Sequence, residues 1–228
     1  MYTMKKILLS LALVLTATAS RAQELTLQTQ QPTTSDLLSM LEENGYKLLV
    51  FDLSPLAGKT YHFDLRVQEY KGGALRKEYT VLTGQTRQDF ADLPAAERQR
   101  LLNDPEIIEA NTARKLLFCF MPAAPDSLQR VSLGTENFKT YLNLPKRPTR
   151  MPLSGLLTYT YSISTFAPTR LITGRFIPLV LFASAHLDDG GRLINQSSTA
   201  VSTDLQDPLL LRSPHCYVLG VTFEEDSM

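Results

Sequence analysis

The sequence has no excess of either charge and, beyond its first residues, no long apolar run. Lysine plus arginine and aspartate plus glutamate both number 23 in 228 residues, so the formal net charge is 0. A nucleic-acid-binding protein needs a basic surface, and the one basic cluster is the short PKRPTR at 145–150. We therefore expect no nucleic-acid partner. No segment after the first 22 residues reaches the roughly 20 apolar residues that span a bilayer, so the sequence predicts no membrane span there.

The common catalytic and nucleotide-binding motifs are also absent. The chain contains no G-x-S-x-G, no H-E-x-x-H, no phosphate-binding G-x-x-x-x-G-K-[ST] and no C-x-x-C. Their absence removes the simplest hydrolase, metalloprotease, nucleotide-binding and thioredoxin-like interpretations. We expect no cofactor, no metal and a non-catalytic role. An enzyme whose site is assembled from residues distant in sequence remains the alternative.

Cysteine is scarce, with only Cys119 and Cys216 in the whole chain. In an exported protein a disulfide between them would close a long loop. Each cysteine, however, is flanked by apolar residues in a strand-like run, where a thiol behaves as a small hydrophobic group. We expect two buried free thiols, with the disulfide as the disfavoured alternative.

The first 22 residues have the features of a secretory signal peptide. Lys5 and Lys6 precede a short apolar run, and the small residues Ser20 and Ala22 fit the cleavage site. We expect cleavage after Ala22 and export to the periplasm or the cell exterior. No cysteine lies near this site, so lipid attachment there is not expected.

Most of the remaining chain reads as β-strands. Apolar and polar residues alternate in TYHFDLRVQEY (60–70) and LTYTYSISTF (157–166), which predicts antiparallel strands with one buried face. Four more continuously apolar runs predict central strands covered on both faces. These runs are KLLVFDL (47–53), KLLFCFM (115–121), FIPLVLFASA (176–185) and HCYVLGVTF (215–223).

Helices are expected to be few. One is predicted in SDLLSMLEENG (35–45), and two short ones follow Asp92 and Asp104, which are the expected N-caps. The fold class is therefore mainly β (α+β): an antiparallel β-sandwich or two packed sheets with a small helical insert near 90–113. We expect one exported domain at 23–228.

Two Gly-Gly stretches, YKGGALRKEY at 70–79 and LDDGGRLINQ at 187–196, resemble each other. Both predict hairpin tips, joining strands 61–70 to 75–82 and 178–187 to 192–200. Each is followed by a cysteine beside an aromatic residue, so a weak internal duplication with halves 23–147 and 148–228 is one interpretation. The unequal spacing favours two ordinary turns.

Candidate binding residues are the pairs His62 with Asp64 and His186 with Asp188. An imidazole and a carboxylate two residues apart share one face of a strand, where they could bind a metal or act as a base with its orienting group. The simpler interpretation places the first pair on a solvated strand face and the second in a turn. His215 is expected to point away from Cys216.

Short motifs also predict modification. Asp126-Ser127-Leu128 and Asp226-Ser227-Met228 resemble an O-glycosylation acceptor of exported proteins, which makes Ser127 a candidate, and Asn195-Gln196-Ser197 fits the N-glycosylation triplet.

The signal peptide ending in RAQ, the mostly β chain and the missing lipidation cysteine together resemble small exported proteins of unknown function from Gram-negative gut commensals. The resemblance rests on layout and implies an exported location and a β-rich fold, with no activity to carry over. We expect a non-catalytic protein that binds a glycan or a surface or periplasmic protein. A secreted hydrolase is the alternative.

Overall fold

A computed structural model describes residues 33–56, 59–87, 90, 92–122, 125–150, 155, 157–167, 172–188, 190, 192–194 and 200–225. The predicted signal peptide, the Asn195–Ser197 triplet and Asp226–Met228 lie outside the described residues. The chain divides into two compact units, 1–38 and 39–228, and every strand belongs to the second unit. No helix among the described residues is both long and apolar enough to cross a membrane.

Nine strands form two antiparallel sheets. The four-stranded sheet has the order β1 (Lys47–Asp52), β4 (Lys115–Met121), β5 (Leu128–Thr135), β6 (Lys139–Pro145). The five-stranded sheet has the order β3 (Ala74–Gln85), β2 (Tyr61–Lys71), β13 (His215–Glu225), β10 (Phe176–Ser184), β9 (Tyr161–Thr165). Two small ribbons pair β7 (Thr149–Arg150) with β8 (Leu157–Thr158), and β11 (His186–Leu187) with β12 (Leu193–Ile194).

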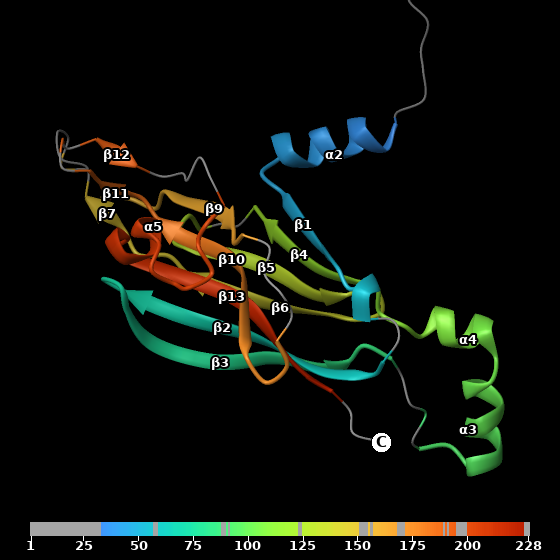
Figure 1. The fold of residues 1–228 in the computed structure, drawn as a ribbon. Coiled ribbons are helices and arrows are strands. Elements are labelled where there is room, and N and C mark those ends of the chain that lie inside the picture. The colour runs from blue at the N-terminus through green and yellow to red at the C-terminus, as the bar shows by residue number, and fades with distance from the viewer. Residues whose placement is uncertain are drawn as a thin grey trace, which may run out of the picture. The chain divides into compact units, whose positions relative to one another are not determined.

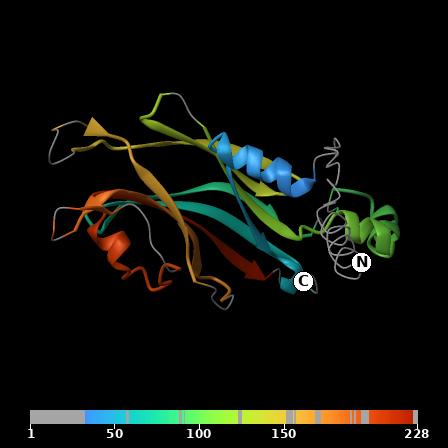
Figure 2. The ribbon, with the colours of Figure 1, turned by 90° about the horizontal axis from the view of Figure 1, so that it is seen from above.

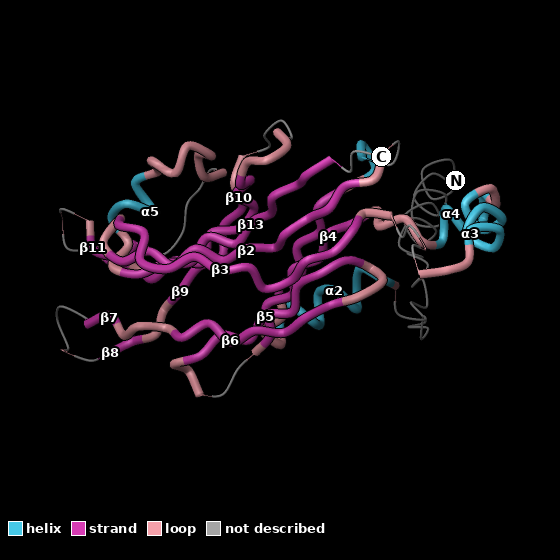
Figure 3. The backbone as a smooth tube through the Cα atoms, turned by 90° about the horizontal axis from the view of Figure 1, so that it is seen from below, coloured by secondary structure: helices cyan, strands magenta, loops and turns pink. Residues whose placement is uncertain are grey.

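The two larger sheets pack face to face, with their strands running in similar directions (Figures 1 and 3). Alternate residues of each strand enter one apolar core between the sheets, because successive side chains of a strand point to opposite faces. From the five-stranded sheet these are Phe63, Leu65, Val67, Val180, Phe182, Leu219 and Val221, and from the four-stranded sheet Leu116, Phe118, Phe120, Val131, Leu133 and Leu144. The predicted mainly β fold with packed sheets is therefore confirmed.

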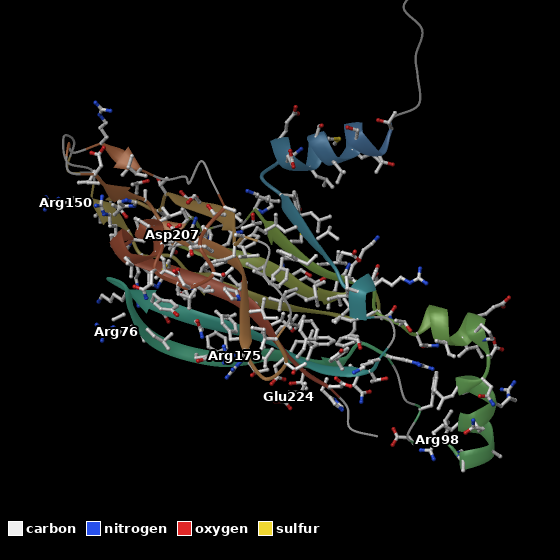
Figure 4. All side chains as sticks on the ribbon, in the orientation of Figure 1. Arg76, Arg98, Arg150, Arg175, Asp207 and Glu224 are labelled. Atoms are coloured by element: carbon white, nitrogen blue, oxygen red, sulfur yellow. The ribbon has the colours of Figure 1, made fainter. Side chains whose placement is uncertain are left out.

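The five-stranded sheet is also covered on its other face. A second cluster joins Leu181 of β10, Cys216 and Val218 of β13, and Leu209 and Leu210 of α5 (Pro208–Arg212). Asp207, labelled in Figure 4, caps this helix, since its carboxylate accepts the Leu209 N–H at 2.8 Å. The prediction that the runs at 176–185 and 215–223 are central strands covered on both faces is confirmed.

The remaining helices of the described residues are α2 (Thr34–Glu43), the short 3-10 helix η1 (Ser54–Leu56), α3 (Ala95–Leu102) and α4 (Pro105–Ala110). The pair α3–α4 is the predicted helical insert, and it lies at the opposite end of the sheets from α5 (Figures 1 and 2). Asp104 caps α4 as predicted, accepting the N–H groups of Glu106 and Ile107. The prediction for Asp92 is wrong, because Pro94 precedes α3 and makes no side-chain cap.

The prediction that KLLVFDL is a central strand is wrong. β1 is the edge strand of the four-stranded sheet and pairs only with β4. Leu49 and Phe51 pack against the core, while Leu48 and Val50 on the opposite face are 46% and 51% exposed. A run of apolar residues shows only that both faces of a strand are apolar. Strand order made β1 an edge strand, and among the described residues its outer face is left partly exposed.

The first Gly-Gly hairpin is confirmed. β2 pairs with β3 around Gly72 and Gly73, whose φ angles of 56° and 75° suit a tight turn. For the second, the described residues pair only at His186–Leu187 with Leu193–Ile194, and Gly191 and 195–199 lie outside the described residues. β10, which leads into this turn, pairs with β9 and β13.

The structure gives no support to a duplication. One hairpin lies in the five-stranded sheet and the other in a separate ribbon, while Cys119 and Cys216 lie on strands of different large sheets. β13, from the predicted second half, pairs between β2 of the first half and β10. The resemblance between the two stretches is that of two ordinary turns.

Candidate functional site

The first predicted pair, His62 and Asp64, lies on one face of β2 as expected. Asp64 accepts the Thr83 hydroxyl at 2.6 Å, and the His62 Nε2 lies 3.4 Å from the side-chain amide of Gln85. Both contacts cross to β3, so each side chain interacts with its cross-strand neighbour. Nowhere in the described part of the chain do three or more His, Cys, Asp or Glu side chains gather as a metal site would require.

In the second predicted pair, the carboxylate of Asp188 makes the hydrogen bonds of a turn. Asp188 accepts the backbone N–H groups of Gly190 at 2.9 Å and Arg192 at 2.8 Å, which is ordinary turn chemistry. His186 is buried, burial lowers its pKa, and its Nδ1 makes no hydrogen bond within the described structure. The simpler interpretation of this pair, a turn, agrees with the observed hydrogen bonds.

Both cysteines carry free thiols. Cys216 is fully buried in the second cluster, and burial raises its pKa to about 12. Cys119 is half-buried on the face of β4 that points away from the core, and burial also raises its pKa. A raised pKa leaves little thiolate near neutral pH, so neither side chain is an activated nucleophile.

Ser127, the candidate for glycosylation, lies in the turn before β5 and is half-buried. Its carbonyl oxygen accepts the Lys146 N–H at 2.7 Å.

An apolar pocket of about 380 Å³ lies between the two sheets, where β1 of one sheet faces the first half of β10 in the other. Its volume falls in the range of ordinary ligand sites, and its walls are mainly apolar. The described residues that line it are Phe51, Asp52, Leu53, Pro55, Leu56, Leu116, Phe166, Ala167, Ile177, Pro178, Leu179, Val221 and Phe223.

Asp52 is the one ionisable side chain among these described lining residues. Hydrogen bonds from Ser54 lower the pKa of its carboxyl group, and one of them, from the backbone N–H to Oδ1, measures 2.9 Å. Asp52 is therefore a carboxylate at neutral pH. Asp52 is exposed and lies with Leu48 and Val50 on the face of β1 that points away from the core, so the pocket itself is mainly apolar and the carboxylate lies outside it, beside the edge of β1.

Sheet edges adjoin the pocket on both sides. Lys47 donates from Nζ to the Ile163 carbonyl at 3.0 Å, which places β1 beside β9. β9 pairs with Val180–Ser184, and the Phe166 N–H that follows it donates to the Leu179 carbonyl at 3.1 Å. The preceding residues of β10, Ile177 and Pro178, form part of the pocket wall together with Leu179.

The outer edge of β1 is unpaired within the described structure. The Leu53 N–H donates to the Arg114 carbonyl at 2.7 Å, one step beyond the Asp52–Lys115 pair. Hydrogen-bonded pairs alternate along an antiparallel ladder, so residues 47, 49 and 51 bond to β4. The N–H and C=O groups of Leu48, Val50 and Asp52 therefore point away from the sheet.

A polar chain at the other end of the sandwich was not predicted from the sequence. His215 is 3% exposed, its Nε2 lies 3.0 Å from Glu69 Oε1, and its Nδ1 lies 2.6 Å from the Tyr161 hydroxyl. The Tyr161 oxygen also accepts the Arg147 N–H at 2.8 Å. The sequence predicted only that a strand begins at His215. It could not predict the partners of His215, because Glu69 and Tyr161 are distant from it along the chain.

The tautomer of His215 follows from these partners. A carboxylate can only accept, so Nε2 carries the proton that it donates to Glu69. Nδ1 is then an acceptor and receives the Tyr161 hydroxyl proton. Burial raises the pKa of Tyr161 to about 12, so this phenol keeps its proton. Each polar group in this hydrogen-bonded series, from Glu69 through His215 and Tyr161 to the Arg147 N–H, has a partner, which is typical of a structural network.

These features define a two-layer antiparallel β-sandwich with an apolar pocket at the edge between its sheets. A family described as a domain of unknown function, DUF5041, matches residues 16–225, and the chain belongs to this family. No curated protein and no solved structure matches the chain.

Proposed function

We propose that this chain is an exported, non-catalytic protein that binds an extended segment of a partner protein. The observation that carries the proposal is the apolar pocket lying beside the unpaired edge of β1. Export rests on the predicted signal peptide at 1–22, and the site of action is the periplasm or the outer surface of a Gram-negative cell.

Binding has more support than catalysis because the pocket offers too few reactive groups. Glycoside hydrolysis uses a pair of carboxyl groups, and acyl transfer uses a nucleophile with an adjacent base. Asp52 is the one ionisable side chain among the described lining residues, and its lowered pKa does not suit a general acid. A secreted hydrolase is the weaker alternative.

A protein partner has more support than a glycan. A sugar presents hydroxyl groups around its ring, and each one that is buried without a hydrogen-bond partner costs free energy. The walls of this pocket are mainly apolar, so they suit an aliphatic or aromatic side chain.

The edge of β1 provides the second half of the proposed site. An extended segment can hydrogen-bond to the outward N–H and C=O groups of Leu48, Val50 and Asp52, as in other cases of strand addition. Phe51–Leu53 of the same chain segment form part of the pocket wall, so alternate side chains of an added strand would face the pocket. The exposed Asp52 carboxylate at this edge favours a lysine or arginine in the added strand, on the face opposite the apolar anchor.

Two variants and one control test this proposal with a displayed library of extended peptides. Ala167→Phe fills the pocket from its wall, and Val50→Pro removes an outward N–H while leaving the bonds to β4 in place. The control, Tyr141→Lys, changes a side chain that is 58% exposed on the opposite edge strand, β6. We expect selected peptides to combine an apolar anchor with a basic neighbour. Both variants should weaken binding at least tenfold and the control should leave it unchanged.

Selected peptides that bind Ala167→Phe as tightly as the wild type would refute the use of the pocket, and equal binding by Val50→Pro would refute strand addition. Displacement of the peptides by a free fatty acid would point to an acyl chain as the natural occupant. Export is tested separately by sequencing the N-terminus of the protein from cells, which should begin at Gln23.

A further inference from the structure

We propose that Tyr161, His215 and Glu69 form an acid-sensitive latch, which holds the segment after β6 against the five-stranded sheet and releases its Arg147 end when His215 gains a proton. The latch lies at the opposite end of β13 from the pocket residues Val221 and Phe223. It does not depend on the proposed partner.

The latch connects elements that are distant in sequence. Glu69 comes from β2, His215 begins β13 and Tyr161 begins β9. The segment that they hold follows β6 of the other sheet, and two tyrosines bind its backbone. Tyr161 accepts the Arg147 N–H at 2.8 Å, and Tyr217 donates to the Pro145 carbonyl at 2.9 Å. The backbone of this segment is thus held by one tyrosine that belongs to the latch, Tyr161, and by one that does not, Tyr217.

Protonation of His215 disturbs the first bond selectively. In the neutral state the Tyr161 hydroxyl has one proton, which it donates to Nδ1, and its oxygen accepts the Arg147 N–H. Once Nδ1 carries a proton, Nδ1–H and the Arg147 N–H both point at the same oxygen. The hydroxyl proton then loses its acceptor in a largely buried position, where an unsatisfied donor is costly. The bond between Tyr217 and Pro145 contains no group that titrates in this range.

The surroundings of His215 determine where the latch opens. Glu69 favours the protonated imidazole, while Lys71 of β2 and Arg147 oppose it. Tyr161 of β9, Tyr217 of β13 and Ser184 of β10 complete the contacts, the last by accepting the His215 backbone N–H at 3.1 Å.

Burial has the largest influence and lowers the pKa of His215 below its ordinary value of 6.5, although the bond to Glu69 acts in the opposite direction. The unfolded chain therefore binds the proton at a higher pH than the folded chain. The stabilisation is complete above the unfolded pKa and is lost as pH falls through the folded pKa. The latch is closed at neutral pH and opens in acid.

Amide hydrogen exchange, expressed as protection relative to the unstructured chain, tests the latch with an internal control. The Arg147 N–H binds Tyr161, whereas the neighbouring Lys146 N–H donates to the Ser127 carbonyl, which is outside the latch. Between pH 7.5 and 5 we expect Arg147 protection to fall at least tenfold while Lys146 protection stays constant. Tyr161→Phe should lower Arg147 protection at both pH values.

Two histidine variants identify the titrating group. His215→Gln should remove the pH response of the Arg147 amide, and His62→Gln, which changes an exposed histidine on β2, should leave that response intact. Nitrogen NMR shifts of wild-type His215 should report the Nε2–H tautomer at pH 7.5, and this measurement serves even if His215→Gln does not fold. The proposal is overturned by an Nδ1–H tautomer, by constant Arg147 protection in the wild type, by a response that persists in His215→Gln, or by equal loss at Lys146 and Arg147.

Discussion

Replacing Gly220 by alanine should destabilise the fold although it adds only one methyl group. Gly220 lies in the middle of β13, opposite Pro178 of β10. A Cβ built there meets the Ile177 carbonyl oxygen at 2.3 Å and the Phe176 ring at 2.6 Å. The ring can rotate away, but the carbonyl belongs to the neighbouring strand and moves only with its backbone.

The expected magnitude follows from this contact. Relieving it displaces β10 from β13 by about 1 Å, and overpacking of this kind costs about 1–3 kcal/mol. Weakening one hydrogen bond of the ladder adds about 1 kcal/mol. The smaller conformational freedom of alanine in the unfolded chain offsets about 0.5 kcal/mol. The net loss is about 1.5–3.5 kcal/mol, which lowers the melting temperature of a domain of this size by about 3–14 °C.

The assay is thermal unfolding followed by circular dichroism, with Gly190→Ala as the matched control. Gly190 lies in the turn before β12, where an added Cβ meets only the tip of the Asp188 side chain at 3.3 Å. The control should melt within about 1 °C of the wild type, since surface changes usually alter stability by less than 0.5 kcal/mol. If Gly220→Ala melts together with its control, β10 and β13 are not as close as the argument requires.

Three further outcomes are expected. Without reductant, a thiol reagent should modify Cys119 slowly in the folded protein and Cys216 only after unfolding, since burial raises both pKa values; a single shared disulfide would leave neither thiol to react. Gly73→Val should destabilise by about 1–2 kcal/mol because a β-branched residue resists positive φ, and more than Gly72→Val, since only the Gly73 position also contacts Leu211. If Ser127 carries a glycan, Ser127→Ala should lower the intact mass of protein purified from the native host by the mass of that glycan in addition to the one oxygen that the substitution removes. A mass that falls by one oxygen alone would contradict the modification.

Local patterns in the sequence were enough to predict the parts of the fold that depend on neighbouring residues. Alternation at Phe63, Leu65 and Val67 predicted their common buried face, because a strand places every second side chain on the same side. The hairpin at Gly72-Gly73 and the helix cap at Asp104 were also predicted, since each depends on backbone conformation within a few residues.

Only the tertiary structure decided which faces are covered and which residues meet. The apolar run of β1 became an edge strand because strand order, which no local pattern contains, placed no further strand of the described residues beside it. The pocket is formed by β1, β10 and β13, and the latch joins His215 to residues 54 and 146 positions away. Side-chain direction is a local property of a strand, whereas pairing brings together distant segments, so the candidate sites appeared only when the chain was folded.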